Sequence, residues 1–453
     1  MKNKKNILKN KNYVHFDNRK KPTYSILKQV SDREWVSKHA FYPFLHFQIK
    51  FNKYTYNKKE NKRIKKIKTR DIYYSAHIDR YIYQYYANEL NDNYNTIAKE
   101  IGINKVSLAY RNNLNGKCNI HFAKKVIDFI SKQEKAFIYV EDFSNFFDNL
   151  NHVYLKEKIC EALKVNKLPK EHYAIFKNIT NFSYIEKEDI LNYKGLKRKE
   201  LNKLDRIFDT AEEFRYFKKI NNHLKKHKDT EKVMEKIGIP QGTPISAVYA
   251  NIYMIDFDKK INDFVTSKKG IYCRYCDDII IVIPLQEEKS EYEIYSKYIK
   301  KIKEIEESIP NLDINEEKTS TFIFKEDKII GIGNTNENHI SYLGFYYDGK
   351  CLRIREKSLF KYYTRMYEKT RVSAKYSVKY GRKVFRKRLY KLYSHLGEKP
   401  RKNEYGNFLT YAKRADKVFG RDNLYDNKIN SQIKRHWEKL QKSLNKNIKK
   451  YKC

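Results

Sequence analysis

The chain has 453 residues and is strongly basic, with 96 Lys and Arg against 55 Asp and Glu and a formal net charge of +41. Its 40% hydrophobic and 15% aromatic fractions are sufficient for a folded core, which excludes a wholly disordered chain. No apolar run approaches the roughly 18–20 residues of a membrane span, and the basic N-terminus lacks the apolar stretch of a secretory signal. Six cysteines do not make a disulfide framework, so we expect a cytoplasmic protein without a membrane partner.

The positive charge is the first indication of function. A surplus this large is costly by self-repulsion unless a polyanion offsets it, and nucleic acid is the usual one. A Lys-rich surface that only reflects biased codon usage is the alternative.

The first 135 residues predict an N-terminal extension followed by a mainly helical region. Tyrosines at helical spacing over 72–100 predict one long helix, whose tyrosine stripe we expect to lie in the core. Residues 105–117 predict a strand with a turn at Asn115-Gly116, and 121–132 predict a second helix.

Residues 136–350 predict an α/β unit with a polar, helical insertion at 186–235. A buried strand with an acidic end and a helix open it, at 137–152 and 154–163. The rest of the unit predicts, in order, a Gly/Pro loop that leads into a helix (236–261), a strand–acidic turn–strand unit (271–284), an amphipathic helix (286–309) and a hairpin that turns at Asp348-Gly349 (341–354).

Residues 351–453 carry 31 Lys and Arg against 8 Asp and Glu, a net of +23. With few Gly or Pro and regular Tyr, Phe and Leu anchors, this segment predicts a bundle of basic helices. Four cations stand close together, and we expect them to share one helix and to contact RNA phosphates, not base edges: Lys383, Arg386, Lys387 and Arg388. A solvated helix face is the alternative.

Three carboxylates form the strongest chemical signal. Asp142 ends an apolar strand, and Asp277 and Asp278 stand in the turn between two apolar strands. Adjacent carboxylates repel each other unless a cation neutralises them. Carboxylates that converge at strand ends can hold two Mg²⁺ ions, with Mn²⁺ as a substitute, and such a metal pair serves nucleotidyl transfer. A surface Asp-Asp turn without function is the alternative.

Five motifs in order resemble those of bacterial reverse transcriptases related to group II introns and retrons. The catalytic-turn motif reads Tyr275-Cys276-Asp277-Asp278, with Cys276 where the family has a small residue such as Ala. The other four are Asp142–Asp148 (DFSNFFD), Gly238–Ser246 (GIPQGTPIS), Leu312–Thr319 (LDINEEKT) and Tyr342–Phe345 (YLGF), the last resembling a primer-grip hairpin.

The resemblance implies a right-hand polymerase fold of the α/β class. Residues 1–135 then form the N-terminal extension and fingers, 136–350 the palm, and 351–453 a helical basic thumb. Asp142, Asp277 and Asp278 map onto the metal-binding aspartates, and the Phe143 carbonyl onto a further metal ligand.

The resemblance also implies residues that bind the incoming dNTP. Phe147, five residues after Asp142, maps onto the steric gate that excludes a ribose 2′-hydroxyl, with an ordinary core residue as the alternative. Gln241 and Gly242 map onto the loop beside the nucleotide, and Arg111 resembles the fingers arginine that holds the triphosphate. Lys318 maps onto the lysine behind the active site. Lys68 and Arg70 are looser candidates for the triphosphate contact.

The stretches Ser75–Tyr83 and Gly116–Ala123 resemble stand-alone reverse transcriptases of bacterial anti-phage defence. This resemblance implies an RNA-directed DNA polymerase that copies a partner non-coding RNA into cDNA, in one branch into repetitive cDNA. We expect no RNase H, integrase or endonuclease unit after the thumb. Two alternatives stay open: a template-independent or protein-primed polymerase of the abortive-infection kind, and a catalytically idle RNA-binding protein.

Overall fold

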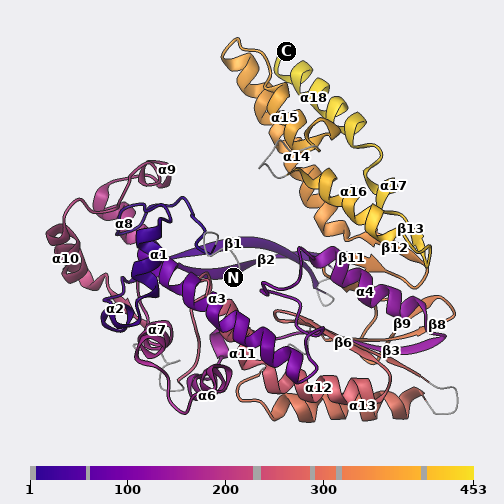
Figure 1. Ribbon diagram of the computed structural model, residues 1–453. Helices are drawn as coiled ribbons and strands as arrows, with labels where there is room; N and C mark the ends of the chain where they lie inside the picture. Colours follow the sequence, from indigo (N-terminus) through magenta and orange to yellow (C-terminus); the bar gives the residue numbers. More distant parts are fainter. Residues whose placement is uncertain are drawn as a thin grey trace.

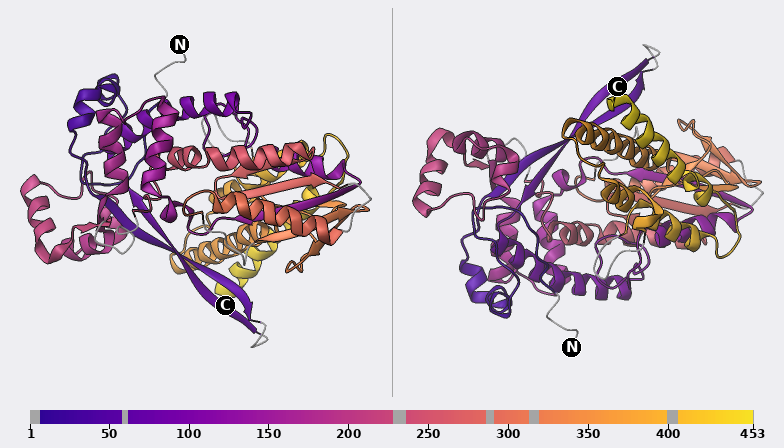
Figure 2. Two further views of the ribbon diagram at one scale, coloured as in Figure 1. Left: turned by 90° about the horizontal axis from the view of Figure 1, so that it is seen from below. Right: turned by 90° about the horizontal axis from the view of Figure 1, so that it is seen from above.

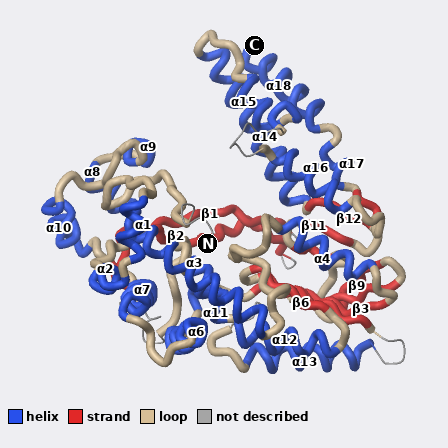
Figure 3. The backbone as a smooth tube through the Cα atoms, in the orientation of Figure 1, coloured by secondary structure: helices blue, strands red, loops and turns tan. Residues whose placement is uncertain are grey.

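The computed structural model describes residues 7–57, 62–227, 236–285, 291–312, 319–398 and 406–452. It has an N-terminal lobe, a central sheet flanked by helices, and a C-terminal helical arm that stands away from both (Figures 1 and 3). Helices and three sheets are combined throughout, so the predicted α/β class is confirmed. Among the described helices, none has the length and apolar character that crossing a membrane requires.

The central sheet has five antiparallel strands in the order β6-β7-β3-β8-β9. Their bounds are Ile271–Tyr275 for β6, Asp278–Pro284 for β7, Lys135–Asp142 for β3, Ser320–Lys325 for β8 and Lys328–Ile332 for β9. The central strands are apolar at almost every position because both faces of the sheet are covered. The predicted strand at the start of 137–152 and the strand–turn–strand unit at 271–284 are therefore confirmed.

Alternate residues of these strands enter two separate cores. Tyr139 and Ile281 pack in the core that contains α11 (Ser246–Tyr253), α12 (Ile255–Ser267) and α13 (Glu291–Glu307). Ile138 and Ile280 face the opposite side, where α4 (Asn119–Ser131) and the C-terminal region cover the sheet. This alternation fixes the register of the sheet, because a slip of one residue would exchange the two faces.

The N-terminal lobe is built around α3 (His77–Glu100), as the tyrosine spacing predicts. Tyr81, Tyr83, Tyr86 and Tyr94 are all buried, so the tyrosine stripe is core. The helix begins at 77 rather than 72 because residues up to 74 pair in a strand. The other helices of the lobe are α1 (Tyr24–Ser31), α2 (Arg33–Lys38), α6 (His152–Leu163) and α7 (Lys170–Thr180).

A long hairpin of β1 (Phe44–Asn57) and β2 (Lys62–Tyr74) projects from this lobe (Figure 2). The basic composition of this segment did not predict it. Ile49 pairs with Arg70 and Phe51 with Lys68, so one face of the hairpin carries apolar side chains on β1 opposite cationic side chains on β2. At its base, β1 continues the sheet to β4 (Ser183–Glu186) and β5 (Lys225–Lys226).

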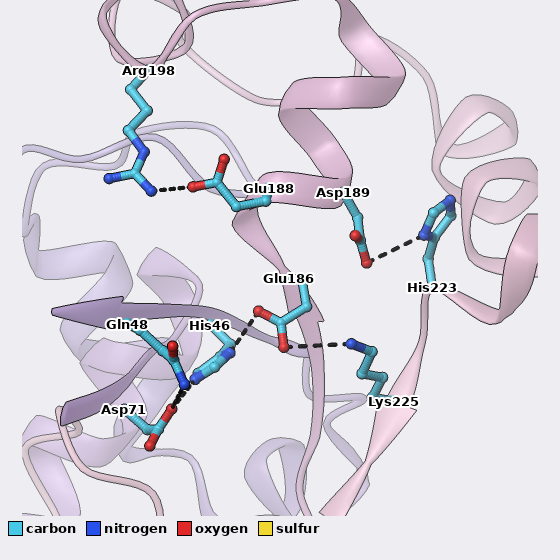
Figure 4. Close-up of polar contacts among 9 residues, drawn as sticks. All are labelled: His46, Gln48, Asp71, Glu186, Glu188, Asp189, Arg198, His223 and Lys225. Carbon is cyan, nitrogen blue, oxygen red and sulfur yellow. Dashed lines mark hydrogen bonds and ion pairs between the residues drawn. The ribbon is translucent and has the colours of Figure 1, made fainter. Parts of the chain in front are cut away.

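The polar insertion is tied to the hairpin by charged contacts (Figure 4). The two ring nitrogens of His46 lie 2.7 Å from Glu186 Oε2 and 2.9 Å from Asp71 Oδ1, and Lys225 Nζ lies 3.5 Å from Glu186 Oε1. The insertion is helical only in part, with α8 (Lys187–Lys194), α9 (Arg198–Leu201) and α10 (Ala211–Lys219), and residues 228–235 lie outside the described chain.

A small sheet joins the palm region to the C-terminal helices. It contains β10 (Ile340–Tyr342), β11 (Phe345–Tyr347), β12 (Cys351–Ile354) and β13 (Asp426–Asn427). Its predicted turn at Asp348-Gly349 is confirmed, with φ of +103° at Gly349. The helices that follow are α14 (Glu356–Lys379), α15 (Arg386–Tyr393), α16 (Phe408–Phe419), α17 (Ile429–Ile433) and α18 (His436–Lys452), so the predicted helical bundle is confirmed.

One strand prediction is wrong. Residues 105–117 form a loop, in which Ser107 alone bridges to Arg274 of β6. The apolar residues Val106 and Leu108 are buried by this crossing, which explains the misleading pattern. The turn at Asn115-Gly116 is correctly predicted, since both residues have positive φ and the N–H of Lys117 donates to the Leu114 carbonyl at 3.0 Å.

Candidate active site

The two acidic motifs meet at one end of the central sheet. β3 ends at Asp142 and β7 begins at Asp278, and these residues are direct cross-strand partners whose side chains leave the same face. Asp277 stands in the turn with Cys276, and the Phe143 N–H donates to the Asp277 carbonyl at 3.3 Å. The expectation that Asp277 and Asp278 both lie in the turn is corrected: the turn is Cys276-Asp277.

The carboxyls of Asp142 and Asp277 lie close enough to interact. Burial, and then the nearby Asp142 carboxylate with which it makes a side-chain contact, raise the pKa of the Asp277 carboxyl. Such a pair is stabilised by a cation, and oxygen donors of this kind suit Mg²⁺ or Mn²⁺. Within the described residues, no three His, Cys, Asp or Glu side chains are grouped as a complete metal site. Asp142, Asp277 and Asp278 are thus not gathered into one ligand group, and the Asp142–Asp277 pair is the part of the predicted set that fits a divalent ion.

The catalytic-turn candidate rests on a fully buried ion pair that sequence reasoning missed. The Arg274 guanidinium donates from Nε to Asp258 Oδ1 at 2.8 Å and from Nη2 to Asp258 Oδ2 at 2.6 Å, and both side chains are completely buried. Its Nη1 donates to the Cys276 carbonyl at 3.0 Å, and the Tyr272 hydroxyl donates to Asp258 Oδ1 at 2.8 Å. Arg274 thus holds the backbone of the turn that carries Asp277. Its hydrogen bond to the Cys276 carbonyl offsets the cost of the unfavourable φ of +63° at Cys276.

The loop Gly238–Ser246 lies against the β1–β2 hairpin and α5 (Phe146–Asn149). The N–H of Tyr73 donates to the Gln241 carbonyl at 2.9 Å. Gly242 has φ of +120°, and a Cβ at this position would come within 2.6 Å of the Tyr73 carbonyl oxygen. Only glycine therefore allows β2 to lie this close to the loop.

Phe147 lies at the edge of the same region. Its carbonyl accepts a hydrogen bond from the Ile239 N–H at 2.8 Å, and its ring is partly buried against Phe146. Its role as the gate stays a prediction. Phe143 is buried between the rings of Phe146 and Phe257, which leaves its backbone as the part that can face a metal.

Arg111, the predicted triphosphate contact, is hydrogen-bonded within its own part of the chain. Its guanidinium donates to Asn95 Oδ1, to Asn104 and to the Ser107 carbonyl, and it lies 5.5 Å from the centre of the Tyr94 ring. These bonds use four of the five N–H donors of the guanidinium and fix the loop that carries Arg111, and its contact with a triphosphate stays a prediction.

Lys68 and Arg70, the looser candidates for that contact, lie on the β1–β2 hairpin. Both are exposed on the face of β2 that also carries Ile72, whose side chain lies 3.5 Å from the Cβ position of Gly242. This face therefore runs outward from the loop that carries Gln241.

Tyr110, which directly precedes Arg111, is a second residue near the catalytic turn that the sequence analysis did not identify. Its side chain is about half exposed, and its backbone has φ of +58°. Partial burial, and then the Cys276 thiol and the Asp277 carboxylate, raise the pKa of its hydroxyl. The only sequence signal was its place beside the predicted fingers arginine.

A cavity of about 380 Å³ opens beside Asp278. Tyr275, Tyr342, Leu343 and Gly344 line it, together with Arg355 at the start of the C-terminal helices. The Asn119 side chain fixes its wall by donating to the Leu343 carbonyl and to the Tyr411 hydroxyl, both at 2.9 Å. The predicted primer-grip hairpin is thus adjacent to Asp278.

The predicted RNA-binding cations of the C-terminal arm lie apart from this site, and one predicted nucleotide-binding residue cannot be placed. Lys318 lies outside the described residues. Lys383, Arg386, Lys387 and Arg388 are all exposed on the C-terminal arm. The prediction that all four share a helix is wrong, because α15 begins at Arg386 and Lys383 lies in the preceding loop after the positive-φ Gly381.

Comparison with known proteins identifies the class of domain. Residues 201–347 match the family model for reverse transcriptase (RNA-dependent DNA polymerase). The match includes the Gly238–Ser246 loop, the Tyr275–Asp278 turn and the Tyr342–Phe345 hairpin. The chain therefore carries a reverse transcriptase domain, and the enzyme class that this domain defines is RNA-directed DNA polymerase, a nucleotidyltransferase. Such domains use divalent metal ions.

Two solved structures of apo telomerase from Candida tropicalis are similar to this chain. The form truncated from its C-terminal domain has a TM-score of 0.39 and 14% identity, over 72% of this chain and 59% of that chain. The other form has a TM-score of 0.34 and 14% identity, over 74% of this chain and 55% of that chain. The chain thus spans less than two thirds of either structure. No curated protein matches the sequence.

Proposed function

We propose that this protein is a metal-dependent reverse transcriptase that adds dNTPs to a primer 3′-hydroxyl at Asp142, Asp277 and Asp278. The observation that carries the proposal is the pairing of Asp142 with Asp278 across β3 and β7, together with the interaction between the Asp142 and Asp277 carboxyls. The matched reverse transcriptase domain contains two of the three carboxylates.

The surrounding residues bind either the metal ions or the incoming nucleotide. Asp142, Asp277, Asp278 and the Phe143 carbonyl would hold two divalent ions. When bound, these ions activate the attacking hydroxyl and stabilise the departing pyrophosphate. Gln241 and Gly242 shape the nucleotide site, Phe147 faces C2′ of the sugar, and Lys68 and Arg70 supply charge for the triphosphate. Lys318 keeps its proposed place behind the site.

We further propose a role in anti-phage defence in the bacterial cytoplasm, with a partner non-coding RNA as template and cDNA, repetitive in one branch, as product. The support is the sequence resemblance at Ser75–Tyr83 and Gly116–Ala123, together with the net charge of +23 over residues 351–453. A basic surface of this kind suits a structured RNA held through its backbone.

Protein priming is a second candidate because of the position of Tyr110. Its side chain is half-exposed, and the Cys276 thiol and then the Asp277 carboxylate lie near enough to its hydroxyl to raise the pKa of that group. In this reaction the Tyr110 oxygen attacks the α-phosphorus of a dNTP, pyrophosphate leaves, and a base takes the hydroxyl proton. The DNA would then stay covalently attached to the protein, and Tyr110→Phe would abolish the attachment.

The decisive experiment combines primer extension with sequencing of the nucleic acid that copurifies with the protein. Asp277→Asn and Asp142→Asn should lower extension roughly a thousandfold, because a lost metal ligand removes several kcal/mol of transition-state stabilisation. Asp205→Asn, an exposed acid on the insertion, is the matched control and should retain full activity. Near wild-type extension by Asp277→Asn would refute the assignment. A sequenced cDNA complementary to one RNA supports templated synthesis, and protein-linked DNA supports the second candidate.

A further inference from the structure

The C-terminal arm leaves an apolar groove open between α14 and α15. The groove has a volume of about 320 Å³. Its walls include Val372, Tyr376, Phe385 and Leu392, whose side chains are 42%, 52%, 58% and 42% exposed. Apolar side chains exposed together in this way usually mark a binding surface.

Regular helix geometry creates the groove. Val372 and Tyr376 are four residues apart on α14 and therefore share one face. On the facing side, Phe385 directly precedes α15, and its N–H donates to the Ser373 hydroxyl at 3.2 Å. This bond fixes the Phe385 backbone to α14 while its ring stays exposed. The stacked rings of Tyr376 and Tyr380, 5.6 Å apart, extend the aromatic surface beyond the groove.

The charge around the groove selects the class of ligand. Lys369 and Arg388 stand among the lining residues. Between 369 and 392 the sequence contains ten Lys and Arg and no Asp or Glu. A ligand that fits must therefore combine a flat apolar body with negative charge directly beside it. An unpaired nucleotide of RNA has both, since its base can stack on aromatic rings and its phosphates can meet the cations.

We propose that the α14–α15 groove binds an unpaired nucleobase of RNA, with Tyr376 and Phe385 as stacking partners and Lys369 and Arg388 as phosphate contacts. The inference rests on the proposed function in that RNA is the partner. It adds that this part of the arm prefers single-stranded RNA, such as a loop or a free end. Cations alone would not make this distinction, because they bind paired and unpaired backbones alike.

The test compares two RNA probes at several salt concentrations: an unstructured oligouridylate and a blunt RNA duplex of equal length. In full-length protein, Tyr376→Ala with Phe385→Ala should weaken oligouridylate binding by roughly tenfold or more, because each stacked base contributes a measurable share of affinity. The duplex affinity and both salt slopes should stay unchanged. Lys369→Gln with Arg388→Gln should instead flatten the salt slope for both probes.

The matched control is Phe360→Ala, which removes an aromatic ring of α14 that is 68% exposed and does not line the groove. It should leave the binding of both probes unchanged. Equal losses for oligouridylate and duplex, or no loss for either, would overturn the proposal and would leave an acidic peptide as the fitting occupant. Primer extension by the wild-type protein on a preformed template–primer is measured separately. A wild-type protein that fails to extend would thus refute the proposed function without deciding the groove.

Discussion

The palm sheet and the C-terminal arm differ in whether their charged side chains are buried or exposed. In the palm, Arg274 is completely buried, and Asp258, the Cys276 carbonyl and Asn251 satisfy its donors. In the arm, Lys383, Arg386, Lys387 and Arg388 are all exposed. One region uses a single charge to fix geometry, and the other gathers many charges on a surface.

The difference predicts how each region responds to substitution. A buried charge that loses its partner carries the full cost of desolvation, so one substitution in the palm has a large effect. Exposed cations each contribute little to stability and act additively on a polyanion. Changes in the palm should therefore alter the reaction and the fold, whereas changes in the arm should alter only binding.

The largest effect should come from separating the ion pair beneath the catalytic turn. Arg274→Met leaves Asp258 buried and unpaired and should destabilise the protein by about 3–5 kcal/mol. Adding Asp258→Asn removes the second charge, so thermal stability should largely recover. Primer extension should not recover, because the Cys276 carbonyl still lacks its donor.

Denaturation midpoints and extension rates measured on both variants check this prediction. Arg274→Lys serves as the control that keeps the charge but loses the two-pronged contact with Asp258. If activity returned together with stability in the double variant, Arg274 would be a stabilising residue only and would not position the turn.

The next effect concerns the sugar of the incoming nucleotide. Phe147→Ala should open space at C2′ and lower the preference for dNTPs over rNTPs by roughly ten- to hundredfold, the range that steric exclusion in a pocket supplies. Phe147→Tyr keeps the bulk of the ring and should keep the preference. Incorporation rates for both nucleotide types give the answer, and an unchanged ratio in the alanine variant would assign Phe147 to the core.

Much of the palm could be predicted from the sequence because its signals are local. The apolar runs at β3 and β7 determine the strands, and an acid at the end of each places Asp142 beside Asp278 once the strands pair. The glycines of the Gly238–Ser246 loop indicate positions where a Cβ atom would clash with a neighbouring backbone, as at Gly242.

Other features depend on contacts between distant residues and therefore left no local signal. The Arg274–Asp258 pair joins β6 to α12, and Arg274 in a strand pattern looks like an ordinary alternating polar residue. The loop at 105–117 has a strand-like pattern because it is buried across β6. Arg111 matched its motif, but its donors are used by Asn95 and Asn104, which only the folded chain brings together.

A smaller effect is expected in the arm. Replacing Arg386, Lys387 and Arg388 by Gln should weaken binding to all RNA sequences alike and reduce the salt dependence by up to about three ion equivalents. Because these residues are exposed, the melting temperature should hardly change. Lys197→Gln, Lys199→Gln and Lys203→Gln, three exposed lysines of the insertion, form a control of equal charge. Identical salt slopes for the two triple variants would show that the arm does not contact RNA preferentially.

The smallest effect should come from a buried carboxyl pair on the far face of β3. Glu141 and Glu306 are both almost fully buried, and burial together with the neighbouring Glu141 carboxylate raises the pKa of Glu306 to about 10. Burial raises the pKa of Glu141 as well. A carboxyl with a raised pKa favours the folded state most below its unfolded pKa of roughly 4.5, and this contribution is lost as the pH rises toward 10.

Glu306→Gln keeps the shape of the protonated carboxyl and cannot ionise, so it should stabilise the protein at neutral pH. We expect a gain on the order of 1 kcal/mol, or about 1 °C in melting temperature for a chain of this length. The gain should grow between about pH 6 and pH 9, because wild-type Glu306 becomes more costly to keep protonated over this range. Glu304→Gln, an exposed acid on the same helix, should show no such trend. A gain that stayed constant with pH would mean that Glu306 is already ionised in the fold and that a cation inside the palm balances the pair.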